Sequence, residues 1–371
     1  MKGTVLITGG AGFIGSHVAS ELLSAGYQVR VLDSLVTQVH GNNPDRPEYL
    51  DEEAEFILGD VRNPEVLDEA LAGVDAVYHF VALVGVGQSM YQIAEYTSVN
   101  NLGTAVLLER LLKHRVRKLI VASSMSIYGE GLYVTPDGQP YMHASRGTRQ
   151  LKAHEWEMIA EDGRPLRPVP TPETKQPSLA SVYALSKYDQ EQMCLIAGRA
   201  YGLPTVALRF FNAYGPYQSL SNPYTGVLAI FASRLMNGKR PIIFEDGRQL
   251  RDFVSVYDIA QACRLALEVE SAQDVVLNVG SGSAITVTEV ARKLARVLGK
   301  DIDPEISGKY RVGDIRHCYP DISQARRVLG YKPSISLEKG MRDLAGWLDR
   351  QTAPDRFNEM REELASRGLV V

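Results

Sequence analysis

The sequence predicts an α/β fold in which a doubly wound parallel sheet is accompanied by a smaller, mixed α/β domain. Short runs of β-branched and other apolar residues alternate with longer segments whose apolar residues recur at a spacing near 3.6, which is typical of helices. The chain has 371 residues, which exceeds one minimal domain and suits one large unit or two unequal ones. Alternation of strands and helices implies right-handed crossovers, and these place helices on both faces of a parallel sheet.

The expected strands are short, apolar and bounded by turn residues. Six are predicted to be buried: Val5 to Thr8, Gln28 to Leu32, Glu55 to Leu58, Asp75 to Phe80, Lys118 to Ala122 and Thr205 to Phe210. Val275 to Val279 could add a seventh strand late in the chain. A helix is predicted from Phe13 to Ser24, and Gly26 is placed to end it. Short helices are also expected at about 226–237, 286–298 and 337–350.

Two interruptions of this alternation define the predicted domains. Tyr128 and Tyr183 lie 55 positions apart, and residues 130–180 between them are rich in Pro, Gly and charged residues. A connection of that length predicts a folded insertion or a lid. From about residue 216 the alternation weakens. We therefore expect a sheet domain made of residues 1–212 with about 253–280, and a smaller domain made of residues 213–252 with 281–371.

Composition and charge argue against several classes of protein. The net charge is −4 without a long run of either sign, so no nucleic-acid or anionic-membrane surface is expected. The three cysteines, Cys194, Cys263 and Cys318, are too far apart to suggest a disulfide framework or a paired metal site. No stretch approaches the roughly 18 unbroken apolar residues of a membrane span. The composition predicts a cytoplasmic protein.

A glycine-rich turn follows the first strand. The segment TGGAGFIGSH, residues 8–17, contains Gly9, Gly12 and Gly15, with Phe13 and Ile14 at the start of the next helix. Glycines permit a tight turn, let backbone amides approach a pyrophosphate and let the helix pack closely against the strand. Because the turn lies between a strand and a helix, it predicts a dinucleotide site and a sheet of the Rossmann type.

The end of the second strand distinguishes the two nicotinamide dinucleotides. Asp33 lies 18 positions after Gly15, where a carboxylate can accept hydrogen bonds from both ribose hydroxyls and repel a 2′-phosphate. NAD is therefore predicted rather than NADP, although Arg30 before the turn keeps the phosphate alternative open. Asp60 and Val61 follow the third strand, and their position predicts that they flank the adenine.

Candidate catalytic residues occur on one helix and at one strand end. Tyr183 and Lys187 form a YxxxK pair, and residues at i and i+4 share a face of a helix. Free tyrosine titrates near pH ~10, and a neighbouring ammonium lowers that pKa and favours a phenolate base. Ser124 ends the fifth strand at the carboxyl edge of the sheet, where ligands bind in such folds. Its hydroxyl could bridge a substrate oxygen and the tyrosine.

Together these features and their order resemble the extended short-chain dehydrogenase/reductase family, and within it the nucleotide-sugar epimerases. The resemblance covers essentially the whole chain and includes the motifs NNLGT (100–104), RFFNAYGP (209–216), LRDFVSVYDIA (250–260) and GDIRH (313–317). It implies an NAD-dependent enzyme that oxidises a nucleotide-linked sugar at C4 and reduces it again on the opposite face. It also implies a homodimer whose interface is formed by helices at about 91–114 and 181–201.

The resemblance assigns roles to single positions. Arg251 and, with a weaker match, Arg316 correspond to arginines that bind the nucleotide diphosphate, and this suits the bidentate geometry of guanidinium groups. The matched positions are the catalytic Ser124, Tyr183 and Lys187, the cofactor-side Ala82 and Asn100, and the substrate-side Ser126, Asn212, Arg251 and Arg316.

One departure from the family pattern narrows the reaction. Related 4,6-dehydratases carry an Asp and a Glu directly after the catalytic serine or threonine, and related decarboxylases also carry a Glu there. This chain has Met125 and Ser126 instead, and neither can act as the acid or base that those reactions need. Dehydration and decarboxylation are therefore disfavoured, and epimerisation at C4 is the predicted reaction.

The insertion at 130–180 resembles that of dTDP-L-rhamnose 4-epimerase-like proteins, so a dTDP-6-deoxyhexose is the expected substrate. Some members of that group carry cysteine pairs there that suggest zinc. This chain has only His143 and His154 in the segment, so no metal is expected. UDP-glucose, UDP-galactose and UDP-glucuronate are the alternative substrates, and a 4-ketoreductase that consumes its cofactor is the alternative enzyme. A non-catalytic dinucleotide-binding protein is disfavoured by the intact catalytic set.

Overall fold

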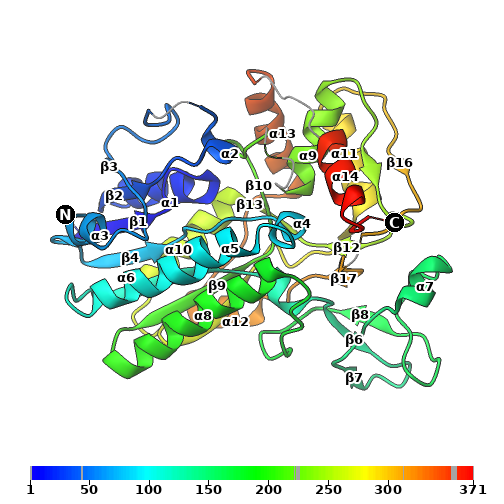
Figure 1. The fold of residues 1–371 in the computed structure, drawn as a ribbon, viewed down its shortest axis with the longest axis horizontal. Coiled ribbons are helices and arrows are strands. Elements are labelled where there is room, and N and C mark those ends of the chain that lie inside the picture. The colour runs from blue at the N-terminus through cyan, green and yellow to red at the C-terminus, as the bar shows by residue number, and fades with distance from the viewer. Residues whose placement is uncertain are drawn as a thin grey trace.

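The computed structural model describes residues 2–42, 45–220, 222, 226–311, 313–351 and 357–370. At its centre is a seven-stranded parallel sheet in the order β3-β2-β1-β4-β5-β9-β14 (Figure 1). Its strands are β1 Thr4–Thr8, β2 Gln28–Asp33, β3 Glu55–Leu58, β4 Ala76–His79, β5 Lys118–Ser124, β9 Thr205–Phe210 and β14 Val275–Val279. All seven predicted strands are confirmed, each to within about two residues at either end.

Helices cover both faces of this sheet, as predicted for a doubly wound fold. One face packs against α1 Phe13–Ser24, α10 Val256–Glu268 and α12 Ser323–Leu329. The other face packs against α3 Pro64–Leu71, α6 Gly103–Leu111 and α8 Val182–Tyr201. Successive strand residues point to opposite faces, so Val5 and Ile7 of β1 belong to the first core and Leu6 belongs to the second.

The direction of winding reverses at β1. The chain first proceeds outward through β2 and β3, and it then returns to place β4, β5, β9 and β14 on the other side. The loops that leave the carboxyl ends of β1 and β4 therefore diverge, and the crevice between such loops is where ligands bind in open α/β sheets. The glycine-rich turn follows β1 directly, and Ser124 is the last residue of β5.

A third core lies beyond the carboxyl end of β9. It contains helices α9 Val227–Met236, α11 Val287–Val297 and α13 Leu337–Leu348, each within about two residues of a predicted helix. The short strands of this region pair as β10 Asn212–Tyr214 with β13 Phe253–Ser255, β11 Ile242–Ile243 with β16 Glu305–Ile306, and β12 Leu250–Arg251 with both β15 Ile285–Thr286 and β17 His317–Cys318. The proposed domain boundaries place most of these elements in the smaller domain.

Residues 130–180 form a folded insertion that projects from the rest of the molecule at the lower right of Figure 1. It contains a small antiparallel sheet in the order β7-β6-β8. A separate core forms beneath it from Tyr133, Ala144, Met158, Ala160 and Leu166. The bounds of its elements are β6 Leu132–Val134, β7 Pro140–Tyr141, α7 Thr148–Lys152 and β8 Arg167–Val169.

The last helix, α14 Phe357–Ser366, packs between the smaller domain and the loop after β4. Its Leu364 lies against Gly87, where an added Cβ would come within 3.1 Å of the leucine side chain. The Arg367 guanidinium lies over the ring of Tyr91, 4.0 Å from the ring centroid. This loop contains the short helix α4 Val86–Ser89 and leads into a continuous helical segment formed by α5 Ile93–Tyr96, the π-helical turn η1 Thr97–Leu102 and α6.

Three features bear on the expectations from composition. Cys194, Cys263 and Cys318 are buried and free, so none of them forms a disulfide. Within the ranges described above, no helix is long and apolar enough to cross a membrane. The same ranges contain no group of three or more His, Cys, Asp or Glu side chains arranged to hold a metal ion.

Candidate active site

The glycine-rich turn after β1 forms a tightly packed cradle. Gly9 has a φ of +71°, and an added Cβ would lie 2.8 Å from the backbone nitrogen of Val81. A Cβ on Gly15 would lie 2.5 Å from the carbonyl oxygen of Gly9, so only glycine allows α1 to approach the turn this closely. Gly12 is the N-cap of α1 and offers no side-chain acceptor to the first N–H groups of the helix. The cradle therefore fits a pyrophosphate group.

Asp33 ends β2 beside this cradle. Its carboxylate accepts the N–H of Ala11 at 3.1 Å and the N–H of Leu35 at 3.0 Å. Burial raises the pKa of Asp33, whereas these hydrogen bonds and the nearby His40 lower it. A carboxylate held in this way against the glycine turn is suited to accept hydrogen bonds from ribose hydroxyls, and its contact with the cofactor stays a prediction.

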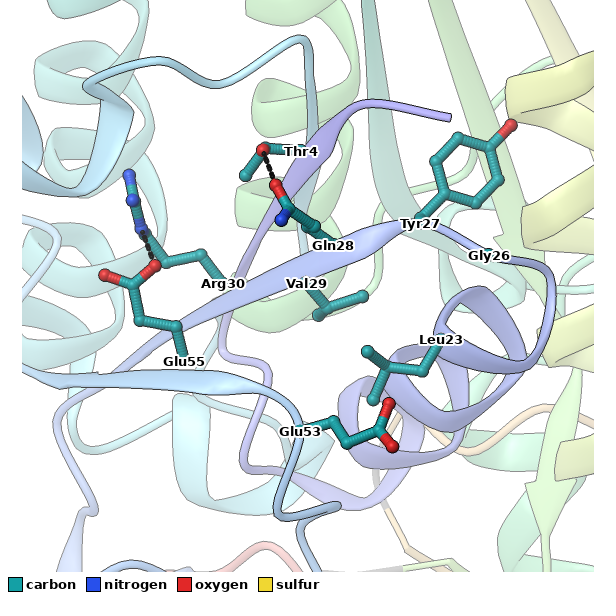
Figure 2. Close-up of a pocket in the computed structure, with 9 residues that line it drawn as sticks. All are labelled: Thr4, Leu23, Gly26, Tyr27, Gln28, Val29, Arg30, Glu53 and Glu55. Atoms are coloured by element: carbon teal, nitrogen blue, oxygen red, sulfur yellow. Dashed lines mark hydrogen bonds and ion pairs between the residues drawn. The ribbon is translucent and has the colours of Figure 1, made fainter. Parts of the chain in front are cut away.

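Arg30 lies away from this site, at the opposite edge of the sheet. Its side chain donates to Glu55 at 2.7 Å and to the carbonyl of Ala70 at 2.9 Å. Arg30 and Glu55 also line a surface pocket, together with Thr4 and other residues at the amino ends of β1, β2 and β3 (Figure 2). Ligands of such sheets bind at the carboxyl ends of the strands, so this pocket is separate from the cofactor crevice. Arg30 therefore offers no support for NADP.

Asp60 and Val61, which are predicted to flank the adenine, both contact other residues of the chain. The Asp60 carboxylate pairs with Arg62 at 2.6 Å, and this hydrogen bond holds the pKa of Asp60 below its usual value. Val61 is buried and packs against Gly103, where an added Cβ would come within 2.6 Å of the valine. Their positions after β3 remain those of an adenine site, and their contact with the base stays a prediction.

Asn100 supports the loop after β4, which begins at Phe80 and includes the half-buried Ala82. Its Oδ1 accepts the N–H of Leu83 at 2.8 Å, and its amide donates to the carbonyl of the same residue at 3.1 Å. The amide also donates to the hydroxyl of Ser186 at 2.9 Å, in the helix that carries Tyr183. Asn100 is fully buried, so here it positions the loop against α8. Contact between Asn100 and the cofactor stays a prediction.

Tyr183 is the second residue of α8 and lies beside the end of β5. The helix is capped by Ser181, whose hydroxyl accepts the N–H of Ala184 at 3.1 Å. Burial raises the pKa of Tyr183 above its usual value, and a hydrogen bond with Ser124 offsets part of that rise. Ser126 donates to the Oγ of Ser124 through its N–H at 3.2 Å and its hydroxyl at 2.8 Å. The predicted catalytic serine and tyrosine are therefore brought together, and Ser126 orients the serine.

Lys187 lies one turn further along α8 and is buried. Its Nζ donates to the Oε1 of Gln190 at 2.8 Å, and burial lowers the pKa of Lys187 to about 8. Gln190 donates in turn to Thr104 at 2.9 Å, and Thr104 also bonds to His79 at 2.8 Å. Burial holds the pKa of His79 at about 3, so this histidine is neutral. In this structure the group that lowers the pKa of Tyr183 is Ser124 rather than the predicted lysine.

Two residues of the site were not predicted from the sequence. Ser89 in α4 accepts the backbone N–H of Tyr183 at 3.0 Å and so caps the catalytic helix from a distant part of the chain. No local pattern links these residues, which are 94 positions apart. Gln190 follows Lys187 by three positions, and this spacing places both side chains on one helix face. The sequence therefore contained a signal for Gln190 but none for Ser89.

Met125 occupies the position at which related dehydratases carry an acid. Its side chain is buried in a cluster with Tyr128, Phe211 and Cys318. A thioether in an apolar cluster can neither donate nor accept the proton that elimination of water requires. The structure therefore agrees with the argument against dehydration.

Asn212 follows β9 at the carboxyl edge of the sheet, where a substrate contact was predicted. Its Oδ1 is buried and has no hydrogen-bond partner in the described part of the chain. Buried polar atoms are nearly always satisfied, so this oxygen is available to accept a hydrogen bond from a ligand.

The two arginines predicted to bind diphosphate differ in their surroundings. The Arg251 guanidinium donates to the carbonyls of Leu250 and Arg316, each at 2.9 Å, and to that of Ile315. Its carboxylate partner Asp314 lies at 4.0 Å, the outer limit of an ion pair. Backbone carbonyls orient a guanidinium without cancelling its charge, so Arg251 retains its attraction for an anion.

Arg316 is fully buried and surrounded by carboxylates. It pairs with Glu245 at 3.0 Å, with Asp246 at 2.6 Å and with Glu157 of the insertion. These carboxylates, of which Glu245 also pairs with Arg146 at 2.7 Å, compensate the charge of Arg316, and in this structure it is not open to a diphosphate. Its visible role is to join the insertion to the smaller domain.

A glycine cradle, an aspartate beside it and a Ser–Tyr–Lys set at the carboxyl edge of a doubly wound sheet define an NAD-dependent enzyme of the short-chain dehydrogenase/reductase class. The chain belongs to the NAD dependent epimerase/dehydratase family, whose model matches residues 5–151 and 157–280.

Similar proteins cover nearly the whole chain. It is 36% identical to the dTDP-L-rhamnose 4-epimerase of Burkholderia thailandensis, over 95% of this chain and 96% of that protein. Among solved structures it resembles the UDP-glucose 4-epimerase of Thermotoga maritima with UDP-glucose, at a TM-score of 0.77 and 30% identity over 94% of this chain and 99% of that one. It also resembles the UDP-glucose 4-epimerase of Thermus thermophilus in complex with NAD, at a TM-score of 0.74 and 31% identity, covering 94% of this chain and 100% of that one.

Proposed function

We propose that this chain, a nucleotide-sugar 4-epimerase, acts on a dTDP-linked 6-deoxyhexose such as dTDP-L-rhamnose. The similarity to a dTDP-L-rhamnose 4-epimerase over most of both chains supports this substrate. An apolar loop beside the catalytic helix also supports it, because Val84 and Val86 are 42% and 41% exposed on the loop that carries Ser89. A methyl group at C6 of the sugar favours such apolar surroundings.

The stretch 214–228 contains Tyr, Leu and Val residues that could surround a methyl group, but it contributes less than this composition indicates. Tyr214 and Leu228 are used in the core of the smaller domain, and residues 221 and 223–225 lie outside the described ranges. The candidates for a 6-carboxylate site are Arg248, which is exposed, and Ser219, whose hydroxyl donates to the carbonyl of Val39 at 3.2 Å.

The observation that carries the proposed chemistry is the Ser124–Tyr183 pair, placed next to Met125 rather than an acid. Tyr183 takes the proton of the C4 hydroxyl as a phenolate, and Ser124 hydrogen-bonds to the same sugar oxygen. Bound NAD supplies the reversible oxidation of C4 and is unchanged at the end of a cycle. After the 4-keto sugar has turned over, Tyr183 returns the proton. Arg251 and Asn212 are proposed to hold the diphosphate, so the sugar is free to turn.

A comparison of substrates tests this function. The purified protein is incubated without added cofactor with dTDP-L-rhamnose, UDP-glucose or UDP-glucuronate, and the C4 isomers are separated and quantified. We expect the highest kcat/KM for dTDP-L-rhamnose, with an advantage over a 6-hydroxyl sugar of about 10- to 200-fold, the range for a methyl-sized difference. A higher value for either uridine sugar would contradict the substrate but leave C4 epimerisation in place. Turnover that consumes NADH or NADPH stoichiometrically would instead identify a 4-ketoreductase.

We also propose that the enzyme is a homodimer formed through α8 and the helical segment 93–111, which lie side by side on one face of the molecule (Figure 1). Large apolar side chains are exposed there: Leu185 and Ile196 are 53% and 57% exposed and lie three turns apart on α8. Light scattering at micromolar concentration should give twice the chain mass, and Ile196→Glu should give a monomer. Ile306→Glu, at an exposed isoleucine of the smaller domain, is the matched control. A monomeric wild-type protein would refute the proposal.

A further inference from the structure

Three loops that are far apart in sequence meet above the glycine cradle. The first comprises residues 35–42 and 45–49 after β2, and it contains the short helix α2 Thr37–His40. Tyr49 of this loop donates its hydroxyl to the carbonyl of Ala11 in the cradle at 2.8 Å. The Nε2 of His40 lies 3.9 Å from the Asp33 carboxylate. The loop therefore lies over the place where the pyrophosphate and ribose of a dinucleotide are held.

The first loop is joined to the loop after β4 by a pair of amide side chains. The Nε2 of Gln38 donates to the Oε1 of Gln88 at 3.0 Å, and the Nε2 of Gln88 donates back to the Oε1 of Gln38 at 3.1 Å. Gln88 is buried, and its Oε1 also accepts the hydroxyl of Tyr96 at 3.2 Å. These two reciprocal hydrogen bonds, one partner of which is buried, therefore hold the two loops together.

The first loop is also joined to the loop after β10, in the smaller domain. The rings of Tyr49 and Tyr217 are stacked, with centroids 4.8 Å apart and planes 12° apart. Tyr217 also meets the edge of Trp347 at 6.2 Å between ring centroids. Tyr217 has a φ of +68° and Leu35 a φ of +48°, a left-handed conformation that bulky L residues rarely adopt. Both loops are thus held in conformations that tertiary contacts must maintain.

We propose that the Gln38–Gln88 pair and the Tyr49–Tyr217 stack form a clasp that closes over bound NAD and slows its release. Because the two sets of contacts hold the same loop to different parts of the molecule, the dinucleotide can leave only after that loop has separated from both. The inference rests on the proposed epimerisation, in which NAD ends each cycle unchanged and has no need to exchange. It assigns to these four residues the retention of the cofactor rather than any step of the chemistry.

The clasp is tested by measuring how fast bound NAD exchanges. Holoenzyme is mixed with excess NAD that is deuterated in the nicotinamide ring. At intervals, samples are desalted to remove free NAD and then denatured. The fractions of deuterated and unlabelled NAD released from the protein are measured by mass spectrometry. Gln38→Ala and Tyr217→Ala should each shorten the exchange half-time about 10-fold, as expected for the loss of one or two contacts. The effects of Gln38→Ala and Gln88→Ala should not add in the double variant Gln38→Ala/Gln88→Ala, because each substitution removes the same pair of hydrogen bonds.

Matched controls are available on other surfaces of the chain. Gln28→Ala removes an exposed glutamine at the amino end of β2, and Tyr201→Ala removes a tyrosine that is 63% exposed at the end of α8. Both should exchange NAD at the wild-type rate. The milder variant Gln38→Asn retains most of the packing, and we expect faster exchange from it too, so a folding defect in the alanine variants leaves the proposal testable.

Unchanged half-times in the clasp variants, or equal acceleration in the controls, would overturn the clasp. Epimerase activity is assayed separately with the nucleotide sugars. Failure to epimerise any of them would contradict the proposed function, whereas the exchange rates judge the clasp alone.

Discussion

Replacing Tyr183 with phenylalanine is expected to lower kcat at least ~10²-fold, because the phenol is the group that exchanges a proton with the C4 oxygen. The ring keeps its place at the start of α8, where Ser89 binds the backbone N–H of residue 183 and not its side chain. Nucleotide-sugar affinity, measured by calorimetry, should therefore change little. The variant should also purify with its NAD bound.

Tyr201→Phe is the control for this experiment. It removes one phenolic hydroxyl from the other end of the same helix, where the side chain is exposed. Wild-type turnover is expected for the control. If Tyr183→Phe retained a near-normal rate, the assignment of the catalytic base would be wrong, whatever the substrate.

Replacing Lys187 with methionine is expected to be equally severe for turnover, at least ~10²-fold, because it removes the ammonium that lies on the same helix face as Tyr183 and can hydrogen-bond the ribose of bound NAD. The same change should relieve a cost in stability. Burial lowers the pKa of Lys187 from 10.5 to about 8, which disfavours its charged form. That shift corresponds to a cost on the order of 3 kcal/mol, since one pKa unit is about 1.4 kcal/mol. The loss of the partner of Gln190 offsets part of this gain, by about 1–3 kcal/mol.

The pH dependence of stability separates these two contributions. Below pH 8 both the folded and the unfolded wild-type protein carry the lysine proton, and the full cost of burying the charge is present. Between pH 8 and pH 10.5 the folded state has released that proton and the unfolded state still binds it, so the wild-type protein gains stability with rising pH relative to Lys187→Met. Thermal unfolding is measured with saturating NAD. Across this pH window, the Tm of the wild-type protein should rise relative to the Tm of Lys187→Met. A constant difference would show that Lys187 titrates as an exposed lysine does.

The fold was predictable because its signals are local and repeat along the chain. The strands of the central sheet are short apolar runs, and the alternation of Val5, Leu6 and Ile7 between two cores is the pattern of a sheet buried on both faces. The glycine turn and Asp33 were predictable for a similar reason, since each occupies a position relative to a strand end that backbone geometry requires.

The site was predictable only where its members are close in sequence or lie at strand ends. Tyr183 and Lys187 share a helix, and Ser124 ends a central strand. The cap that Ser89 provides, by contrast, depends on how a loop folds back onto α8. No sequence pattern predicts such a contact, because it depends on the packing of two separate elements.

Arg316 shows that a matching sequence motif does not determine the surroundings of a residue in the folded chain. Its motif predicted an arginine for the diphosphate, and the residue type and the neighbouring sequence both suited that role. Its environment is set by Glu157, Glu245 and Asp246, which come from two other segments and surround the guanidinium. The charge that an arginine offers to a ligand depends on the carboxylates around it, and these meet only in the folded chain.

The position of α14 also bears on how a newly made molecule matures. Leu364 and Arg367 contact Gly87 and Tyr91, in the loop that carries Ser89. They leave the ribosome after every other residue of the site, during synthesis at about 5–20 residues per second. The central sheet can therefore assemble on the nascent chain while this loop still lacks its last support. The loop that carries Ser89 therefore gains these two contacts only after the central sheet can form.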